Sequence, residues 1–219
     1  MTASSYLSSV RASYDAVAAD YARPLGAEPA GRPLDRAMLA AFAECVRGEA
    51  GGGRAVADLG CGPGRVTAQL ARLGVRAFGI DLSPAMVAVA RRSHPGLRFE
   101  VGSMASLDMA DGVLGGVLAW YSTVHTPPSE LPPLFGEFAR VLAPGGHVLI
   151  AFEAGDGMIR PGTGNGGTGH PVDLDVYRTP PGRVAELLAG AGLSEVARLL
   201  RAPDAHEHSP QAFLLARKP

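Results

Sequence analysis

Apolar residues recur along the middle of this chain in two alternating patterns. Segments such as 55–59 and 75–80 are short and almost continuously apolar, which is typical of strands buried on both faces of a sheet. The segments between them carry apolar residues at helical spacing. Because strand, helix and strand in succession fold as right-handed crossovers, the alternation predicts an α/β fold with a parallel sheet. The expected strands are 55–59, 75–80, 97–101, 113–120 and 147–153, and the expected helices are 64–73, 84–92 and 129–142.

Both ends of the chain add further elements. The residues Val10, Tyr14, Val17 and Tyr21 share one face of a helix expected within 5–21, and Leu34, Met38 and Phe42 predict a second amphipathic helix that ends near Gly48. A glycine-rich run at 155–169 is expected to be a mobile lid or loop. A half-exposed strand at 172–178, a helix at 181–191 and strands at 195–201 and 211–217 follow. We divide the chain into an N-terminal helical cap with its linker, 1–53, and a core, 54–219, within one structural domain.

Composition narrows the classes of protein that fit. The chain has 219 residues, of which 47% are hydrophobic, and a formal net charge of -1. This length supports one sizeable core, and the near-neutral charge argues against a nucleic-acid surface. Neither an apolar run of about 18 residues nor a signal peptide is evident, so we expect no membrane contact. Cys45 and Cys61 form no disulfide or zinc pattern. We therefore expect a cytoplasmic monomer or homodimer whose partner is a small molecule.

The segment 55–67, AVADLGCGPGRVT, carries the strongest functional signal. Glycines at positions 60, 62 and 64 allow positive φ and the close approach of a ligand at the end of a buried strand. About twenty residues later, Asp81 ends the next strand, where its carboxylate could accept both hydroxyls of a ribose. Arg65 occupies the place of the last glycine of a dinucleotide fingerprint, and no P-loop lysine follows. The pattern predicts a site for an adenosine-like group and disfavours NAD and nucleoside triphosphates.

The pattern D-x-G-x-G-x-G, from Asp58 to Gly64, resembles motif I of the class I S-adenosylmethionine (SAM) dependent methyltransferases. Asp81 with Leu82 resembles the acidic end of that family's second strand. The segments GSMASLD at 102–108 and LAPGGHVLI at 142–150 resemble its adenine-binding loop and a later helix-turn-strand. A glycine turn that serves only as a tight connection is the alternative.

This resemblance implies both a fold and an activity. The fold would be a Rossmann-like, seven-stranded, mostly parallel sheet in the order 3-2-1-4-5-7-6, with helices on both faces and a terminal antiparallel hairpin. The activity would be transfer of a methyl group from SAM to a small-molecule acceptor, such as a secondary metabolite, with S-adenosylhomocysteine as product. A protein that binds SAM without methyl transfer, for a cyclisation or as a regulatory ligand, is the alternative function.

The resemblance also assigns cofactor-binding residues. The segment SYDAVAADYA at 13–22 resembles the YDxxAxxY segment whose first tyrosine often closes over SAM in this family, although core packing would explain the tyrosines equally well. Trp120 could contact the cofactor or pack in the core. The complete set of cofactor candidates is Tyr14, Tyr21, Asp58, Gly60, Cys61, Gly62, Gly64, Asp81, Leu82, Met86, Ser103, Met104 and Trp120.

The catalytic candidates lie in WYSTVHTPP, residues 120–128, directly after the fourth strand. His125 could act as a general base, since an imidazole titrates near neutral pH, but it could also bind the acceptor or be structural. Tyr121 could supply an aromatic wall and a hydroxyl. Further acceptor contacts could come from Glu153, His170 and Tyr177. The candidates for catalysis are therefore His125 and Tyr121. We expect no metal site, because His206 and His208 lie in a polar turn without acidic or cysteine partners.

Overall fold

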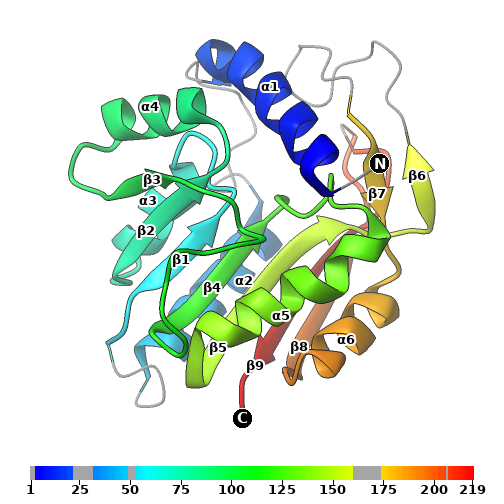
Figure 1. Cartoon of the computed structure of the whole chain (residues 1–219). Coiled ribbons are helices and arrows are strands. Elements are labelled where there is room, and N and C mark those ends of the chain that lie inside the picture. The colour runs from blue at the N-terminus through cyan, green and yellow to red at the C-terminus, as the bar shows by residue number, and fades with distance from the viewer. Residues whose placement is uncertain (1–2, 22–31, 49–52, 160–173, 206) are drawn as a thin grey trace.

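The computed structural model describes residues 3–21, 32–48, 53–159, 174–205 and 207–219. Its centre is a seven-stranded sheet in the order β3-β2-β1-β4-β5-β9-β8 (Figure 1). Strands β1 to β5 pair in parallel, whereas β9 is antiparallel to both β5 and β8. This confirms the Rossmann-like, mostly parallel fold with a terminal antiparallel hairpin. The sheet strands are β1 (Val56–Leu59), β2 (Ala77–Asp81), β3 (Phe99–Val101), β4 (Leu114–Trp120), β5 (Leu142–Glu153), β8 (Ser194–Arg201) and β9 (Gln211–Arg217).

Strands β9 and β8 occupy the last two positions of the sheet. The predicted order has strands seven and six there. The difference arises from two short strands between β5 and β8, namely β6 (Gly157–Ile159) and β7 (Val176–Arg178). These two pair with each other as a separate antiparallel ribbon and do not join the large sheet. The strand expected at 172–178 is therefore the β7 half of this ribbon, and its first two residues lie outside the described ranges.

Alternate residues of each strand face two different layers of helices, as the two-residue period of a strand requires. Val117 and Ala119 of β4 pack in one cluster with α5 (Leu131–Val141) and α6 (Pro181–Gly190). Leu118 of β4 packs in the other cluster with α2 (Pro33–Arg47) and α3 (Arg65–Arg72). Phe42 of α2 is fully buried there, so α2, which was assigned to the cap, packs directly on the sheet.

One helix crosses above the carboxyl ends of the parallel strands. Figure 1 shows α1 (Ala3–Tyr21) at this edge of the sheet, beside α4 (Pro84–Ser93). Val17 and Ala18 of α1 pack on Met86 and Val89 of α4, and all four side chains are buried. The predicted N-terminal helix therefore has a docking surface on the core. Residues 22–31, which follow this helix, and residues 49–52 of the predicted linker lie outside the described residues.

Most predicted boundaries differ from the structure by one or two residues, and the start of β5 differs by more. The strand expected to begin at 147 extends back to Leu142, because Leu142 pairs with Leu114 before a register shift in the β4–β5 ladder. The turn expected at Pro144 and its neighbouring glycines is therefore part of an extended, irregular strand start. The helix expected from 129 begins as a short 3-10 turn, Pro128–Glu130, followed by α5. Among the described helices, none is long and apolar enough to cross a membrane.

Candidate functional site

The turn between β1 and α3 has the left-handed conformation that the three glycines predicted. The φ angles of Gly60, Gly62 and Gly64 are 72, 53 and 80°. A Cβ atom on Gly60 would lie 2.3 Å from the Cβ of Ser122, and one on Gly64 would lie 2.6 Å from Phe99. A Cβ on Gly62, in contrast, would meet no atom within 4 Å. The outer two glycines are therefore required by packing, and the middle one leaves open space beside the backbone where a ligand can approach.

Asp81 connects this turn to the start of α4. Its Oδ2 accepts a hydrogen bond from the amide of Gly62 at 2.8 Å, and its Oδ1 accepts one from the amide of Ser83 at 2.8 Å. Burial raises the pKa of Asp81 above its ordinary value, although both amide hydrogen bonds act in the opposite direction. Because each carboxylate oxygen can accept more than one hydrogen bond, Asp81 can still accept ribose hydroxyls. The half-buried Leu82 follows it at the same edge of the sheet.

Asp58 lies beneath the turn, inside the core. Its side chain is buried, and its Oδ2 accepts a hydrogen bond from the Thr67 hydroxyl of α3 at 2.5 Å. Burial raises its pKa to about 7. Cys61, also a cofactor candidate, is buried between the turn and the β3–α4 region, where Phe99 packs against it. The structure thus places Asp58 where it joins the strand to α3.

The raised pKa of Asp58 predicts an unusual pH dependence of stability. The folded protein keeps a proton on Asp58 up to about pH 7, whereas the unfolded chain loses it near pH 4. The free energy of unfolding should therefore fall as pH rises through this window, by at most about 1.4 kcal/mol per pH unit from this group. Urea unfolding at several pH values should show that Asp58→Asn removes this contribution. An identical pH slope in both proteins would contradict the assignment.

The loop after β3 lies next to Asp81. The amide of Gly102 donates to the Asp81 carbonyl at 3.0 Å, and Ser103 and Met104 follow. The Ser103 hydroxyl accepts from the Ala105 amide at 3.2 Å, and Met104 packs at the border of the core. These predicted adenine-loop residues therefore share one edge with the carboxylate. Met86, the remaining α4 candidate, is buried beneath α1.

Trp120 and Tyr121 pack toward α2 at the end of β4. Their ring centroids lie 5.3 and 6.3 Å from that of Phe213 in β9. Tyr121 has a φ of 54°, and burial raises the pKa of its phenol well above the ordinary value. The hydroxyls of Tyr121 and Ser122 are buried without a hydrogen-bond partner among the described residues. Trp120 is only partly buried against this cluster, and two buried hydroxyls at the strand end have no partner among the described residues.

His125 joins three parts of the chain. Its Nε2 lies 3.0 Å from the Tyr14 hydroxyl of α1, 111 residues away, and its Nδ1 lies 2.8 Å from the carbonyl oxygen of Asp175. Because a carbonyl can only accept, Nδ1 carries the proton and Nε2 accepts from Tyr14. Burial lowers the pKa of His125, which favours this neutral form. The structure therefore brings together Tyr14, a candidate for cofactor binding, and His125, a candidate for catalysis.

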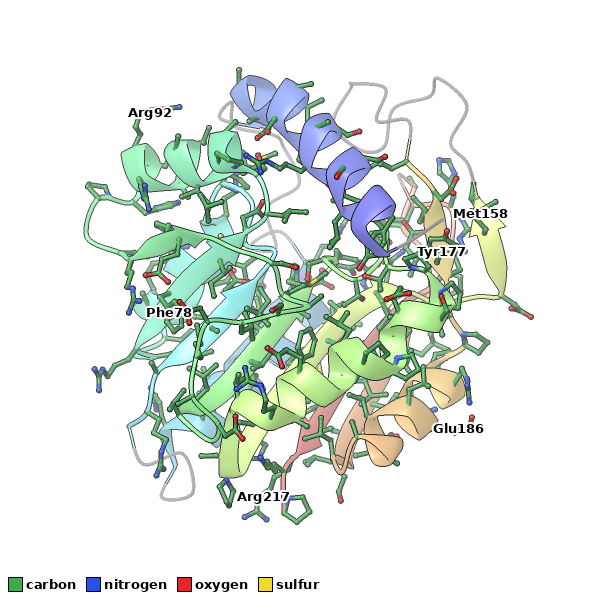
Figure 2. All side chains as sticks on the ribbon, in the orientation of Figure 1. Phe78, Arg92, Met158, Tyr177, Glu186 and Arg217 are labelled. Carbon is green, nitrogen blue, oxygen red and sulfur yellow. The ribbon has the colours of Figure 1, made fainter. Side chains whose placement is uncertain are left out.

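The remaining acceptor candidates lie around the β6–β7 ribbon. Glu153 accepts from Arg178 Nε at 3.2 Å and from the Ser209 hydroxyl at 2.9 Å. The Tyr177 amide donates to the carbonyl of Val124 at 2.7 Å, which attaches the ribbon to the His125 loop. Figure 2 shows Tyr177 near the α1 side of the molecule. His170, His206 and the side chain of Tyr21 lie outside the described residues. No group of three or more potential metal ligands occurs in the described part of the chain.

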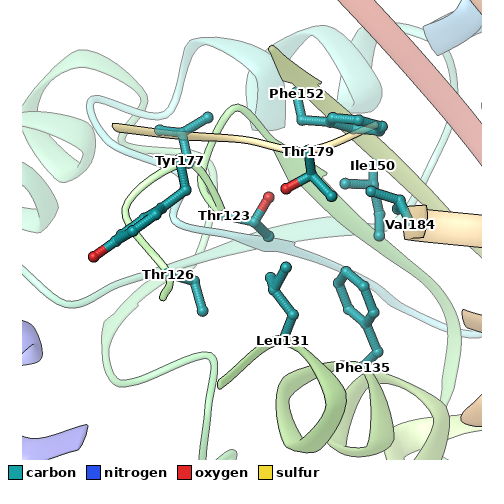
Figure 3. A pocket seen from close by; sticks show the side chains of 10 residues that line it. Thr123, Thr126, Leu131, Phe135, Ile150, Phe152, Tyr177, Thr179 and Val184 are labelled. Carbon is teal, nitrogen blue, oxygen red and sulfur yellow. The ribbon is translucent and has the colours of Figure 1, made fainter. Parts of the chain in front are cut away.

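A small cavity opens beneath this ribbon. Its volume is about 10 Å³, room for about one water molecule. Its lining includes Thr123, Thr126 and Thr179 together with apolar side chains such as Phe135 and Phe152 (Figure 3). In Figure 3 the Tyr177 hydroxyl points away from the other lining side chains. The lining carries no charged side chain among the described residues, so it suits an uncharged group.

Three residues with contacts at this edge were not singled out as site residues from the sequence. Asp15 bonds Ser83, Ser122 touches the glycine turn, and Asp175 orients His125. Ser122 lies within the segment already quoted around His125, and its place after the fourth strand could have indicated it. Asp15 stands next to Tyr14, but nothing in its local sequence identifies its partner on α4.

The geometry at this edge fits an adenosine-bearing cofactor. Open space beside Gly62, further acceptor capacity on Asp81 and the unpaired Ser122 hydroxyl all lie at the carboxyl ends of β1, β2 and β4. Ligands of doubly wound α/β proteins bind at this edge, where the strand order reverses. The fold and the site together define a nucleoside-binding protein of the Rossmann-like class.

The central part of the chain is similar to known methyltransferases. Residues 56–146 match a family described as methyltransferase domain. A trans-aconitate 2-methyltransferase of Methylobacterium nodulans is 39% identical over 127 residues, which are 56% of this chain and 43% of the relative. A demethylmenaquinone methyltransferase of Beutenbergia cavernae is 34% identical over 99 residues, which are 45% of this chain and 40% of the relative. The match to the methyltransferase domain covers less than half of this chain, and the chain spans about two fifths of the length of these curated relatives.

A solved structure shows the same fold over the whole chain. This is the 1,6-didemethyltoxoflavin-N1-methyltransferase of Burkholderia thailandensis, determined with bound 1,6-didemethyltoxoflavin and S-adenosylhomocysteine. It is 22% identical, has a TM-score of 0.70, and the alignment covers 100% of this chain and 91% of that one. At this identity the likeness concerns the fold alone.

Proposed function

We propose that this protein transfers the methyl group of SAM to a small-molecule acceptor. The observation that carries the proposal is the Gly62–Asp81 arrangement, in which an open left-handed glycine lies against the carboxylate that ends β2. The curated relatives act on small molecules according to their names, which supports the same class of acceptor here. When bound, SAM supplies an activated methyl group on a sulfonium, so the protein has to bind, align and, for some acceptors, remove a proton.

The cofactor-binding residues follow from the edge geometry. The Gly62 backbone would lie against the ligand, and Asp81 would accept the ribose hydroxyls. Ser103 and Met104 would lie beside the adenine, since their loop adjoins Asp81. Helix α1 would cover the site and exclude water, with Tyr14 facing the end of β4 through its bond to His125.

His125 is the proposed residue for acceptor handling. Burial lowers its pKa, which favours the neutral ring, and in that form Nε2 accepts from Tyr14. Proton abstraction by His125 therefore requires the acceptor to replace Tyr14 at Nε2. If the acceptor needs no base, the same nitrogen can orient it by a hydrogen bond. The cavity beneath the β6–β7 ribbon lies on the same loop, has no charged lining among the described residues and has room for about one water molecule.

Incubation with methyl-labelled SAM tests the proposal directly. Extracts of small metabolites are offered as acceptors, and the label is followed by mass spectrometry. Appearance of a methylated acceptor together with S-adenosylhomocysteine is expected. If SAM binds but its methyl group is never transferred to any acceptor class, the protein uses its cofactor in another way.

Asp81→Ala should weaken SAM binding about tenfold or more, because each charge-assisted hydrogen bond to a ribose hydroxyl contributes roughly 1.5 to 3 kcal/mol. Titration calorimetry with SAM and S-adenosylhomocysteine provides the measurement, and NAD is expected not to bind. Glu186→Ala is a matched control, since Glu186 is an exposed carboxylate on α6, far from α1 in Figure 2. Unchanged SAM affinity in the Asp81 variant would rule out this carboxylate as the ribose ligand.

A further inference from the structure

Helix α1 is attached to the core by one carboxylate as well as by apolar contacts. Asp15 Oδ1 accepts a hydrogen bond from the Ser83 hydroxyl at 2.6 Å and another from the Ala85 amide at 3.2 Å. Its half-buried side chain also lies 3.8 Å from Arg11, one turn earlier in α1. Seventy residues of sequence separate Asp15 from Ala85, so this contact depends on the tertiary fold.

The contact completes the first turn of α4. The first amide hydrogens of a helix lack partners within the helix. Pro84 has no amide hydrogen, Met86 donates to the Ser83 side chain at 3.0 Å, and Val87 donates to the Ser83 carbonyl. The Ala85 amide is left, and Asp15 accepts its hydrogen bond. A negative carboxylate is also favoured beside a helix N-terminus.

The position of Asp15 matters for the cofactor edge. The Ser83 hydroxyl donates a hydrogen bond to Asp15, while the amide of the same residue donates to Asp81. The residue before Asp15 is Tyr14, whose hydroxyl bonds to His125. One turn of α1 therefore contacts both Ser83, which is bonded to Asp81, and His125 in the loop after β4. The apolar contacts of Val17 and Ala18 with α4 fix the same face of the helix.

We propose that Asp15 is a positioning residue that holds α1 closed over the cofactor edge before the cofactor arrives. By anchoring α1 on α4 it sets the rotation of the helix and so delivers Tyr14 to His125. The predicted exchange of α1 does not depend on the proposed function. The predicted effect of Asp15 on cofactor affinity does rest on it. Ligand-free protein should consequently have a protected α1.

The test combines two variants of Asp15 with hydrogen exchange of residues 3–19, measured without ligand. Asp15→Ala should speed exchange of this helix about tenfold or more while the exchange of β4 and β5 stays unchanged. Asp15→Asn should exchange nearly like the wild type, because its side-chain carbonyl can accept the same two hydrogen bonds. Unchanged α1 exchange in Asp15→Ala, or a spread of faster exchange through the central strands, would overturn the proposal.

A double-mutant cycle separates the direct contact from general weakening. Asp15→Ala and Ser83→Ala should be non-additive in their effect on α1 exchange, since both remove the same hydrogen bond between the two side chains. Ser93→Ala is the matched control at the exposed other end of α4 and should be additive with Asp15→Ala. Additivity of the Asp15 and Ser83 changes would contradict a direct anchor.

Cofactor binding gives the functional measurement. Asp15→Ala should lower the affinity for S-adenosylhomocysteine about tenfold and raise the KM for SAM similarly, because binding must then order α1. At saturating SAM, kcat should stay within about twofold of the wild type, since the bound state restores closure. An unchanged affinity with a loose α1 would overturn the positioning role. Failure of the wild-type protein to bind S-adenosylhomocysteine would instead refute the proposed function and leave the exchange test valid.

Discussion

Gly62→Val should abolish measurable SAM binding, with a loss of affinity of a hundredfold or more. The φ of 53° disfavours a β-branched residue, and the new side chain would project into the open space that we assign to the ligand. A clash with the ligand and a distorted turn act together here. A hundredfold loss of affinity corresponds to about 2.8 kcal/mol of binding free energy. A side chain that fills the space of the ligand can readily cause a loss of this size.

Gly192→Val is the control for backbone strain. Gly192 also has a positive φ, 82°, and open space beside it, but it lies between α6 and β8, away from the carboxyl edge. Both variants should lose comparable stability, and only the Gly62 variant should lose SAM binding in calorimetry. Near-normal affinity in Gly62→Val would mean that the cofactor does not lie on this turn.

His125→Ala is expected to have the largest effect on turnover. A general base contributes about 10²- to 10⁴-fold in rate, whereas an orienting hydrogen bond to a neutral group contributes roughly 0.5 to 1.5 kcal/mol, near tenfold. We expect a loss above a hundredfold in kcat with little change in SAM affinity. The measurements are steady-state turnover and, separately, calorimetric SAM binding.

The pH profile distinguishes the roles of His125. The neutral imidazole is the active base, so kcat should fall on the acid side as the ring becomes protonated, and burial moves that limb below the ordinary pKa of histidine. In His125→Ala the limb should vanish. Tyr14→Phe is a matched variant, because it removes the hydroxyl at Nε2 and keeps the ring and the histidine. Full turnover in His125→Ala with lower thermal stability would assign the histidine a structural role.

Local sequence determined the cofactor edge of this protein. Glycine permits the left-handed backbone found at residues 60, 62 and 64, and the strand that ends in Asp81 was predicted from its apolar run and from the Ser-Pro start of the next helix. The helix predicted at 84–92 extends over Pro84–Ser93 in the structure. Such features depend on residues a few positions apart, which is why they could be predicted.

Tertiary structure decided the partners of the site residues. Tyr14 and Asp175 meet at His125 from positions 111 and 50 residues away, and no local pattern encodes such a pairing. The same holds for Tyr121, a catalytic candidate whose ring packs on Phe213 in the core, and for Asp15, whose partner lies on α4. Hydrophobic period fixes which face of an element is buried, but side-chain contacts arise only when the sheet order brings distant segments to one edge. The sequence by itself therefore determined the local structure of the proposed cofactor edge, and packing between distant elements decided which side chains surround it.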